Sequence, residues 1–329
     1  MNIRKLFVLT LKIAFAVAVL VWMTHTGKLN FAQVGAAFRQ WPQVLGIVAI
    51  ICVQIAIMTW RWNMLTNALG FGLHYREAFS LSLIGLLFTV VIPGSVGGDV
   101  MKAYYVGKRV SQGRAQAITT VLVDRYLGLL SLLALGSIGV VLNFEIVSQH
   151  SALATLATFI TIAFAGGAAL LVIAVLISGR VSGWMRRLEV RLPALAVLVR
   201  CWDSVKTYRN QPRVLFTGML ISLPAHFLAC IGFYLAMTAV NGPQVSPERL
   251  LLVIPIALIT TAIPLSPGGV GIGQAAVYAL FNAVEPVAAE SASNAFTVYQ
   301  TLQIAVFLTG FVPYFAWSDV RSEAAEVAT

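Results

Sequence analysis

Long apolar segments separated by short polar linkers dominate this chain. Each is hydrophobic continuously rather than at alternate positions, and each is close to the roughly 20 residues that a helix needs to cross a bilayer. The segments are Leu6–Met23, Val44–Leu65, Ala117–Leu142, Leu153–Ile177, Val214–Val240 and Ala295–Trp317. The pattern predicts an all-α polytopic membrane protein with about six full transmembrane helices.

Two apolar segments, Ala78–Val91 and Leu250–Ile263, are shorter than the others. At about 1.5 Å per residue each spans roughly 21 Å, which is less than the thickness of the hydrocarbon core. Each is followed by a cluster of proline and glycine and by a second arm, Asp99–Arg114 or Val270–Val284, that is too polar or too short to cross. We predict that each pair of arms forms a re-entrant helical hairpin.

The two proline and glycine clusters are Val91–Asp99 and Ile263–Gly271. Backbone that leaves helical geometry inside a membrane must be buried in protein or line a water-filled cavity, because unpaired N–H and C=O groups are costly in lipid. Broken helices in matching positions of two halves mark the substrate site of many secondary transporters. The clusters therefore predict a site near the middle of the membrane, with plain buried helix–helix turns as the alternative.

Loop charges predict the orientation. The loop at residues 179–213 contains eight basic and two acidic side chains, which the positive-inside rule places in the cytoplasm. The linkers Asn143–Ser151 and Glu285–Asn294 contain no Lys or Arg and are predicted to be external. Both termini are then cytoplasmic. The single membrane domain divides into halves, 1–152 and 153–329, with the same four elements in the same order but in opposite orientations across the membrane.

Composition agrees with this class. The chain is 59% hydrophobic and 10% charged, whereas a soluble domain is about 25% charged. The net charge of +10 is concentrated in loops, so topology explains it better than nucleic-acid binding. The three cysteines form no CxxC pair. We therefore expect no disulfide framework, no metal site and no cofactor.

Several motifs resemble the transmembrane, flippase-type domain of lysylphosphatidylglycerol synthases. The first motif is Pro93-Gly94-Ser95-Val96-Gly97-Gly98-Asp99, followed by Lys102-Ala103-Tyr104 and Val123-Asp124-Arg125-Tyr126-Leu127-Gly128. The second is Pro264-Leu265-Ser266-Pro267-Gly268-Gly269-Val270-Gly271, and Trp60-Arg61-Trp62 resembles a further element. The resemblance covers nearly the whole chain.

The resemblance implies a lipid-translocating protein of the bacterial inner membrane. Family members are linked to aminoacylated phosphatidylglycerol, hopanoids and glycolipid or polysaccharide precursors. In bifunctional members a soluble transferase domain follows, whereas this chain ends at Thr329, just past the last span, so we expect a stand-alone member without enzymatic activity. The family usually has a Glu shortly after the second motif. The Gln274 found here counts against a titrating or coupling role at that position.

Charged residues inside apolar sequence are the best candidates for a substrate site. Asp99 and Lys102 are close enough for a same-face pair that either stabilises the arm or joins an anion site. Adjacent Asp124 and Arg125 need separate partners: the first hairpin or a lipid phosphate for Arg125, and Lys102 or Arg61 for Asp124. A purely structural ion-pair network is the alternative.

Two further polar residues favour structural roles. Arg61, between two tryptophans, is more typical of an interfacial anchor, and His226 of a satisfied buried polar group. We expect no catalytic residues. The candidate substrate-binding and translocation residues are Pro93, Gly94, Gly97, Gly98, Asp99, Lys102, Asp124, Arg125, Arg61, Pro267, Gly268, Gly269, Gly271 and Gln274.

The leading hypothesis is an inner-membrane lipid flippase or transporter for an anionic or modified lipid, such as a phospholipid, hopanoid or glycolipid precursor. The alternatives are an ion-coupled transporter of a soluble anion and a non-catalytic accessory subunit of envelope polysaccharide or lipid assembly. The expected partners are membrane lipids with anionic headgroups and no nucleic acid. A homo-oligomer or an envelope-biosynthesis partner stays open.

Overall fold

The computed structural model describes residues 3–91, 97–110, 113–191, 208–263 and 265–316, and in these ranges the chain is helical without any strand. The longer helices are α1 (Ile3–His25), α3 (Trp41–Ala68), α6 (Arg114–Leu142), α8 (Ser151–Arg191), α10 (Pro212–Ala239) and α13 (Ala289–Leu308). The shorter ones are α2 (Phe31–Ala37), α4 (Tyr75–Val91), α5 (Gly97–Arg109), α7 (Phe144–Gln149), α11 (Pro247–Thr261), α12 (Ile272–Val284) and α14 (Phe311–Ala316). Two 3-10 turns are η2 (Pro267–Gly269) and η3 (Pro286–Ala288).

Within these ranges five helical segments are long and apolar enough to cross a membrane. They are α3, α6, α10, residues Ser151–Leu176 of α8, and Pro286–Ala316, which includes α13 and α14. In α1 the described apolar part, Thr10–His25, is shorter than these five. The prediction of an all-α polytopic membrane protein is confirmed.

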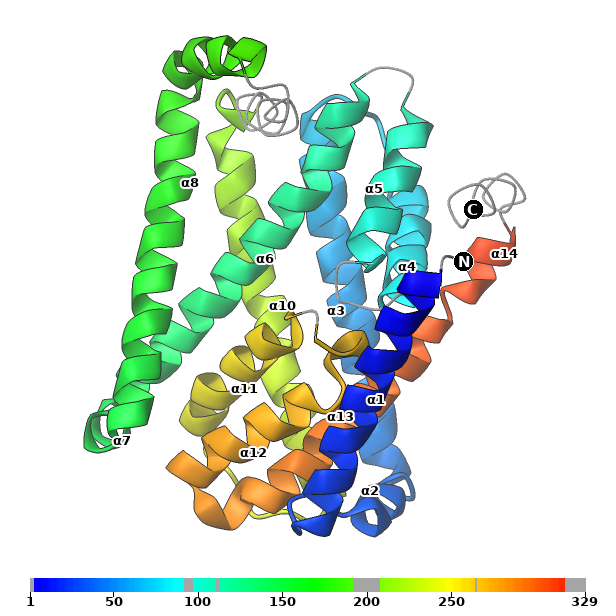
Figure 1. The fold of residues 1–329 in the computed structure, drawn as a ribbon, viewed down its shortest axis with the longest axis vertical. Coiled ribbons are helices and arrows are strands. Elements are labelled where there is room, and N and C mark those ends of the chain that lie inside the picture. Colours follow the sequence, from blue (N-terminus) through cyan, green and yellow to red (C-terminus); the bar gives the residue numbers. More distant parts are fainter. Residues whose placement is uncertain (1–2, 92–96, 111–112, 192–207, 264, 317–329) are drawn as a thin grey trace.

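Two predicted boundaries are wrong. The second arm of the first pair ends at Arg109 instead of Arg114, because Gly113 has a left-handed φ of 73° and Arg114 begins α6. The predicted span Leu153–Ile177 agrees with the apolar segment Ser151–Leu176, and α8 continues beyond it to Arg191, with its last part turned relative to the rest (Figure 1). The first part of the predicted basic loop, up to Arg191, is therefore helical and belongs to α8.

The last predicted span, Ala295–Trp317, is also not one helix. Helix α13 begins earlier, at Ala289. The helical geometry is interrupted at Thr309 and Gly310, before α14 begins. A Cβ atom on Gly310 would lie 2.3 Å from the carbonyl oxygen of Leu83 in α4. The interruption therefore occurs where two backbones touch and only glycine fits.

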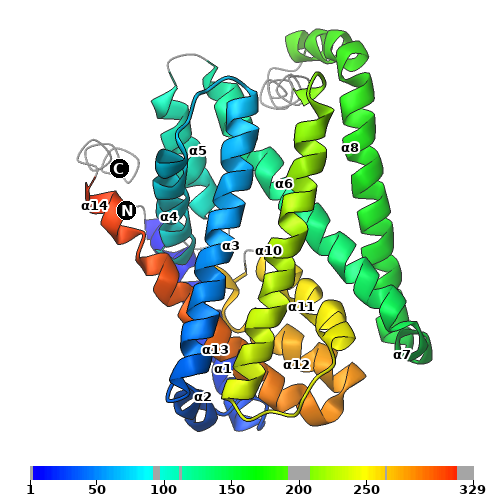
Figure 2. The ribbon, with the colours of Figure 1, turned by 180° about the vertical axis from the view of Figure 1, so that it is seen from behind.

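The two short helix pairs lie at different ends of the molecule. Figures 1 and 2 show α4 and α5 beside one part of α3, and α11 and α12 beside the opposite part of α10. Helices α3 and α10 pack against each other, and α6 crosses between the two ends, in contact with α5 and α11. The arrangement leaves the polar residues of α3, α5 and α6 facing one another.

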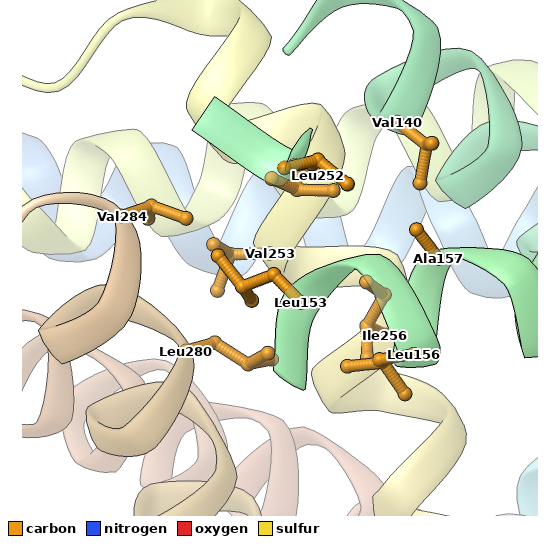
Figure 3. Close-up of a pocket in the computed structure, with 10 residues that line it drawn as sticks. Val140, Leu153, Leu156, Ala157, Leu252, Val253, Ile256, Leu280 and Val284 are labelled. Atoms are coloured by element: carbon orange, nitrogen blue, oxygen red, sulfur yellow. The ribbon is translucent and has the colours of Figure 1, made fainter. Parts of the chain in front are cut away.

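Each helix pair has its own hydrophobic core. Around α11 and α12 the core includes a stacked pair, Phe233 and Phe281, with ring centroids 6.0 Å apart. Around α4 and α5 it includes fully buried Trp62 and Ile84. A crevice of about 10 Å³ between α6, α7, α8, α11 and α12 is lined, among the described residues, by aliphatic side chains alone (Figure 3). It has room for about one water and no polar partner for it, so it is a packing gap and not a ligand site.

Candidate functional site

A cavity of about 390 Å³ lies between α3, α4, α5, α6, α10, α11 and α13. Its volume is within the ~300–1,000 Å³ range of small-molecule sites. Its charged residues lie on α3, α5 and α6 and are called here the charged wall, whereas Gln54, Tyr299 and Gln303 on α3 and α13 are called the neutral wall. The polar lining consists of Gln54, Thr59, Arg61, Ser82, Thr89, Asp99, Lys102, Asp124, Arg125, His226, Thr261, Tyr299 and Gln303.

The carboxylate of Asp124 on α6 is the centre of the charged wall. Its Oδ1 accepts a hydrogen bond from Arg61 Nε at 2.8 Å, and its Oδ2 lies 3.6 Å from Lys102 Nζ. A further guanidinium nitrogen of Arg61 donates to the Asp124 main-chain oxygen at 2.9 Å. The Arg61, Lys102 and Asp124 side chains are 4%, 11% and 13% exposed, so one buried carboxylate neutralises only one of two buried cations.

Both cations have additional contacts that fix their positions. Arg61 also donates to the hydroxyl of Ser222 on α10, and Lys102 Nζ lies 3.9 Å from the centre of the Trp62 ring. Trp62 in turn donates through Nε1 to Thr120 Oγ1 on α6, at 3.1 Å. These contacts connect α3, α5, α6 and α10 through the site.

The interpretation of Arg61 as an interfacial anchor is wrong. Helix α3 directs Trp60 outward, where it is 55% exposed, and buries Trp62 completely. Arg61 is on the buried side because its guanidinium has a carboxylate, a hydroxyl and a carbonyl oxygen to bind. These partners satisfy the buried guanidinium inside the protein, so it does not have to reach the lipid headgroups.

A second ion pair lies on the same wall and is more accessible. Arg125 Nη1 lies 2.9 Å from Asp99 Oδ2, and the two side chains are 45% and 29% exposed. The first-hairpin partner expected for Arg125 is therefore Asp99. The same-face pair of Asp99 with Lys102 is replaced by two pairs between helices, because Lys102 is directed toward Asp124.

The first glycine cluster contributes Gly98 to the cavity lining. A Cβ atom on Gly98 would lie 2.1 Å from Thr89 Oγ1 and 2.2 Å from the carbonyl oxygen of Gly85, so α4 and α5 touch backbone to backbone. Gly97 is buried but is not among the lining residues. Pro93 and Gly94 lie outside the described residues.

The second cluster contributes Gly268, whose carbonyl oxygen accepts a hydrogen bond from Gln300 at 3.0 Å. Gln274 is 1% exposed; its Oε1 accepts from the N–H of Gly271 and its Nε2 donates to Gln300 Oε1, both at 2.8 Å. This glutamine therefore holds the turn by donating and accepting at once. Pro267, Gly269, Gly271 and Gln274 do not line the cavity, so the structure places them beside the site.

The neutral wall was not found from the sequence. Tyr299 donates to Gln54 Oε1 at 2.9 Å, and Gln54 donates to the carbonyl oxygen of Ala225 at 2.9 Å. Gln303 completes this wall. His226 donates through Nε2 to the carbonyl oxygen of Gly128 at 3.1 Å, as expected for a satisfied polar group. The signal available in the sequence was a set of amide and hydroxyl side chains within otherwise apolar helices.

Comparison with known proteins identifies a matching family. A model of the family described as the lysylphosphatidylglycerol synthase TM region matches residues 9–310. The chain belongs to this family. Membership confirms the resemblance seen in the motifs, and it supports a function related to membrane lipids.

Among the relatives of this family member is a UPF0104 membrane protein from Methanothermobacter thermautotrophicus. It is 28% identical over 311 residues, which cover 87% of this chain and 90% of the relative. A second UPF0104 membrane protein from that organism is 21% identical over 85% of this chain. One from Methanocaldococcus jannaschii is 31% identical over 85 residues, 26% of this chain and 25% of the relative. No solved structure matches.

Proposed function

We propose that this protein moves a lipid with an anionic headgroup between the leaflets of its membrane. The observation that carries the proposal is the convergence of Arg61, Lys102 and Arg125 from three helices on one cavity among apolar helices. Charged side chains are expensive inside a membrane and are retained where they act on a substrate or an ion. Family membership supports the lipid part of the proposal.

In this proposal Arg125 makes the first contact with the headgroup. It is the most exposed of the three cations, and its planar fork can bind two phosphate oxygens at once. Arg61 and Lys102 lie deeper and supply a positive field there. The lipid tails stay in the bilayer while the phosphate occupies the cavity, as the apolar side chains of the lining permit.

Alternating exposure of the cavity would come from the two short helix pairs. We interpret α4 with α5 and α11 with α12 as re-entrant elements of an inverted repeat, with both termini cytoplasmic. Rocking of two such halves around a fixed site is a recognised mechanism of secondary transporters. The position of the pairs at opposite ends of the molecule supports this interpretation (Figure 1).

The test is reconstitution of the purified protein into vesicles that contain a fluorescent anionic lipid, with chemical quenching of the outer leaflet. The protein should transfer label between leaflets, and Arg125→Ala should reduce the rate at least tenfold. Arg109→Ala is the matched control, because Arg109, the last residue of α5, is also an arginine in an ion pair, but its partner is Glu77 and neither residue lines the cavity. Failure to move any lipid, with uptake of a water-soluble anion instead, would favour the ion-coupled transporter.

A further inference from the structure

Building on the proposed lipid transport, we propose that the cavity selects a headgroup with a single negative charge and a neutral, hydroxyl-bearing part. The chemical class is a phosphodiester of a polyol or sugar. A phosphomonoester and a headgroup with an ammonium group are then poor substrates. Two independent observations support this choice: the charge balance of the cavity and its unpartnered hydroxyl groups.

The charge balance follows from the lining residues. Among the described residues that line the cavity, the cations are Arg61, Lys102 and Arg125, and the carboxylates are Asp99 and Asp124. The first-motif residues 92–96, which are not described, contain no ionisable side chain. With His226 neutral, one positive charge is left without a counter-ion.

One uncompensated charge matches one phosphodiester. In a cavity of low dielectric constant, a ligand charge that neutralises the charge of the cavity is favourable. A larger ligand charge leaves an unbalanced charge in the cavity and is costly. A phosphodiester carries one negative charge and neutralises the site. A phosphomonoester carries about 1.5 to 2 negative charges near neutral pH and exceeds the balance.

Among the described lining residues, both carboxylates are already paired, so none is free for an ammonium group. Asp124 is shared by Arg61 and Lys102, and Asp99 is paired with Arg125. A zwitterionic or aminoacylated headgroup would therefore bring a cation beside three existing cations, with both carboxylates already engaged. Burying an unpaired charge is unfavourable, so such headgroups should be rejected.

The remainder of the cavity is suited to hydroxyl groups. Thr59 on α3 and Ser82 on α4 are among the lining residues, and their hydroxyl oxygens are buried with no hydrogen-bond partner in the part of the chain that the structure describes. These residues are only 1% and 8% exposed. Because buried hydroxyls are nearly always hydrogen-bonded, they are the groups that a polyol or sugar hydroxyl would satisfy. Gln54 and Tyr299, which also line the cavity, are neutral polar groups hydrogen-bonded to each other.

The first experiment compares headgroups in the vesicle assay. Fluorescent phosphatidylglycerol should be transferred at least tenfold faster than phosphatidic acid or phosphatidylethanolamine. Asp99→Asn gives the cavity a second uncompensated charge and should shift the preference toward phosphatidic acid. The matched control, Glu77→Gln, also removes a carboxylate from an ion pair with an arginine of α5, but outside the cavity, and should leave the preference unchanged.

The second experiment separates headgroup chemistry from lipid transport. Glycerophosphoglycerol, glycerol phosphate and glycerophosphoethanolamine are tested for thermal stabilisation of the purified protein. Glycerophosphoglycerol should stabilise it most, and Thr59→Val with Ser82→Ala should remove that advantage, whereas Thr158→Val on the exposed side of α8 should not.

The outcomes are distinguishable. Equal transfer of all three lipids would overturn the headgroup inference and leave the proposed lipid transport intact. No lipid transfer combined with selective stabilisation by glycerophosphoglycerol would refute lipid transport and support the headgroup inference for a soluble diester. No lipid transfer and equal stabilisation by the three soluble compounds would refute both.

Discussion

The buried carboxylate of Asp124 offers the sharpest test of the site's energetics. In Asp124→Asn the volume is nearly unchanged, but Arg61 and Lys102 lose their shared negative charge. Removing one partner of a buried ion pair costs about 3–5 kcal/mol, because an uncompensated buried charge remains. The remaining contacts of Arg61 with Ser222 and of Lys102 with the Trp62 ring reduce this cost. We therefore expect a loss of about 3 kcal/mol.

Asp99→Asn is the matched control for this prediction. It makes the same chemical change in a neighbouring pair whose members are 29% and 45% exposed. Pairs that water can reach contribute only about 0.2–1 kcal/mol. The free energy of unfolding, measured by SDS titration in mixed micelles, should therefore fall several times more for the Asp124 variant than for the Asp99 variant.

A double variant tests the stated cause. Adding Lys102→Met to Asp124→Asn removes one of the two orphaned cations and should restore part of the lost free energy. Equal losses in the two single variants, or a further loss in the double variant, would refute the reasoning that an uncompensated buried charge sets the cost.

Three other substitutions test the packing around the site. Gly98→Ala should lower the free energy of unfolding by about 1–3 kcal/mol, because its Cβ would overlap Thr89 and the backbone of Gly85. The control Gly166→Ala, which has open space around it, should be neutral or stabilising. SDS titration measures the free energy of unfolding of both variants. Gln274→Glu removes the hydrogen bond donated to Gln300, so the charged form should be less stable than the wild type at neutral pH and recover on acidification; an unchanged stability across pH would contradict the donor role. Tyr299→Phe should cost about 0.5–1.5 kcal/mol through its lost hydrogen bond to Gln54, and a larger loss would indicate a packing role instead.

The sequence was sufficient to predict the long apolar helices. It was also sufficient to predict that the charged residues within them need partners on other helices. Continuous apolar segments have one stable form in lipid, and adjacent Asp124 and Arg125 cannot pair with each other on a helix. The sequence could not say that Arg61 faces inward, because Trp60 and Trp62 are the same residue type and only packing decides which one is buried. The interruption at Gly310 likewise depends on the approach of α4.

The neutral wall was beyond sequence reasoning for a similar reason. Gln54 and Tyr299 are far apart in the chain and carry no charge, so no local pattern indicates that they face one cavity. In the sequence, Gln274 counts only against a titrating or coupling role at that position. The structure instead gives it two hydrogen bonds that hold the second turn, and this role appears only when Gln300 is brought beside it.

The claim that a lipid headgroup enters this cavity is tested most directly by position-specific photocrosslinking. A photoreactive residue replaces Leu129, which lines the cavity and is 39% exposed, or Ile162 on α8, which is 65% exposed and lies outside it. Proteins are reconstituted in vesicles of known composition, and the crosslinked lipids are identified by mass spectrometry. Position 129 should capture anionic lipid well above its share of the vesicle, with the enrichment lost in Arg125→Ala, whereas position 162 should match the bulk composition. Bulk composition at both positions would contradict the account.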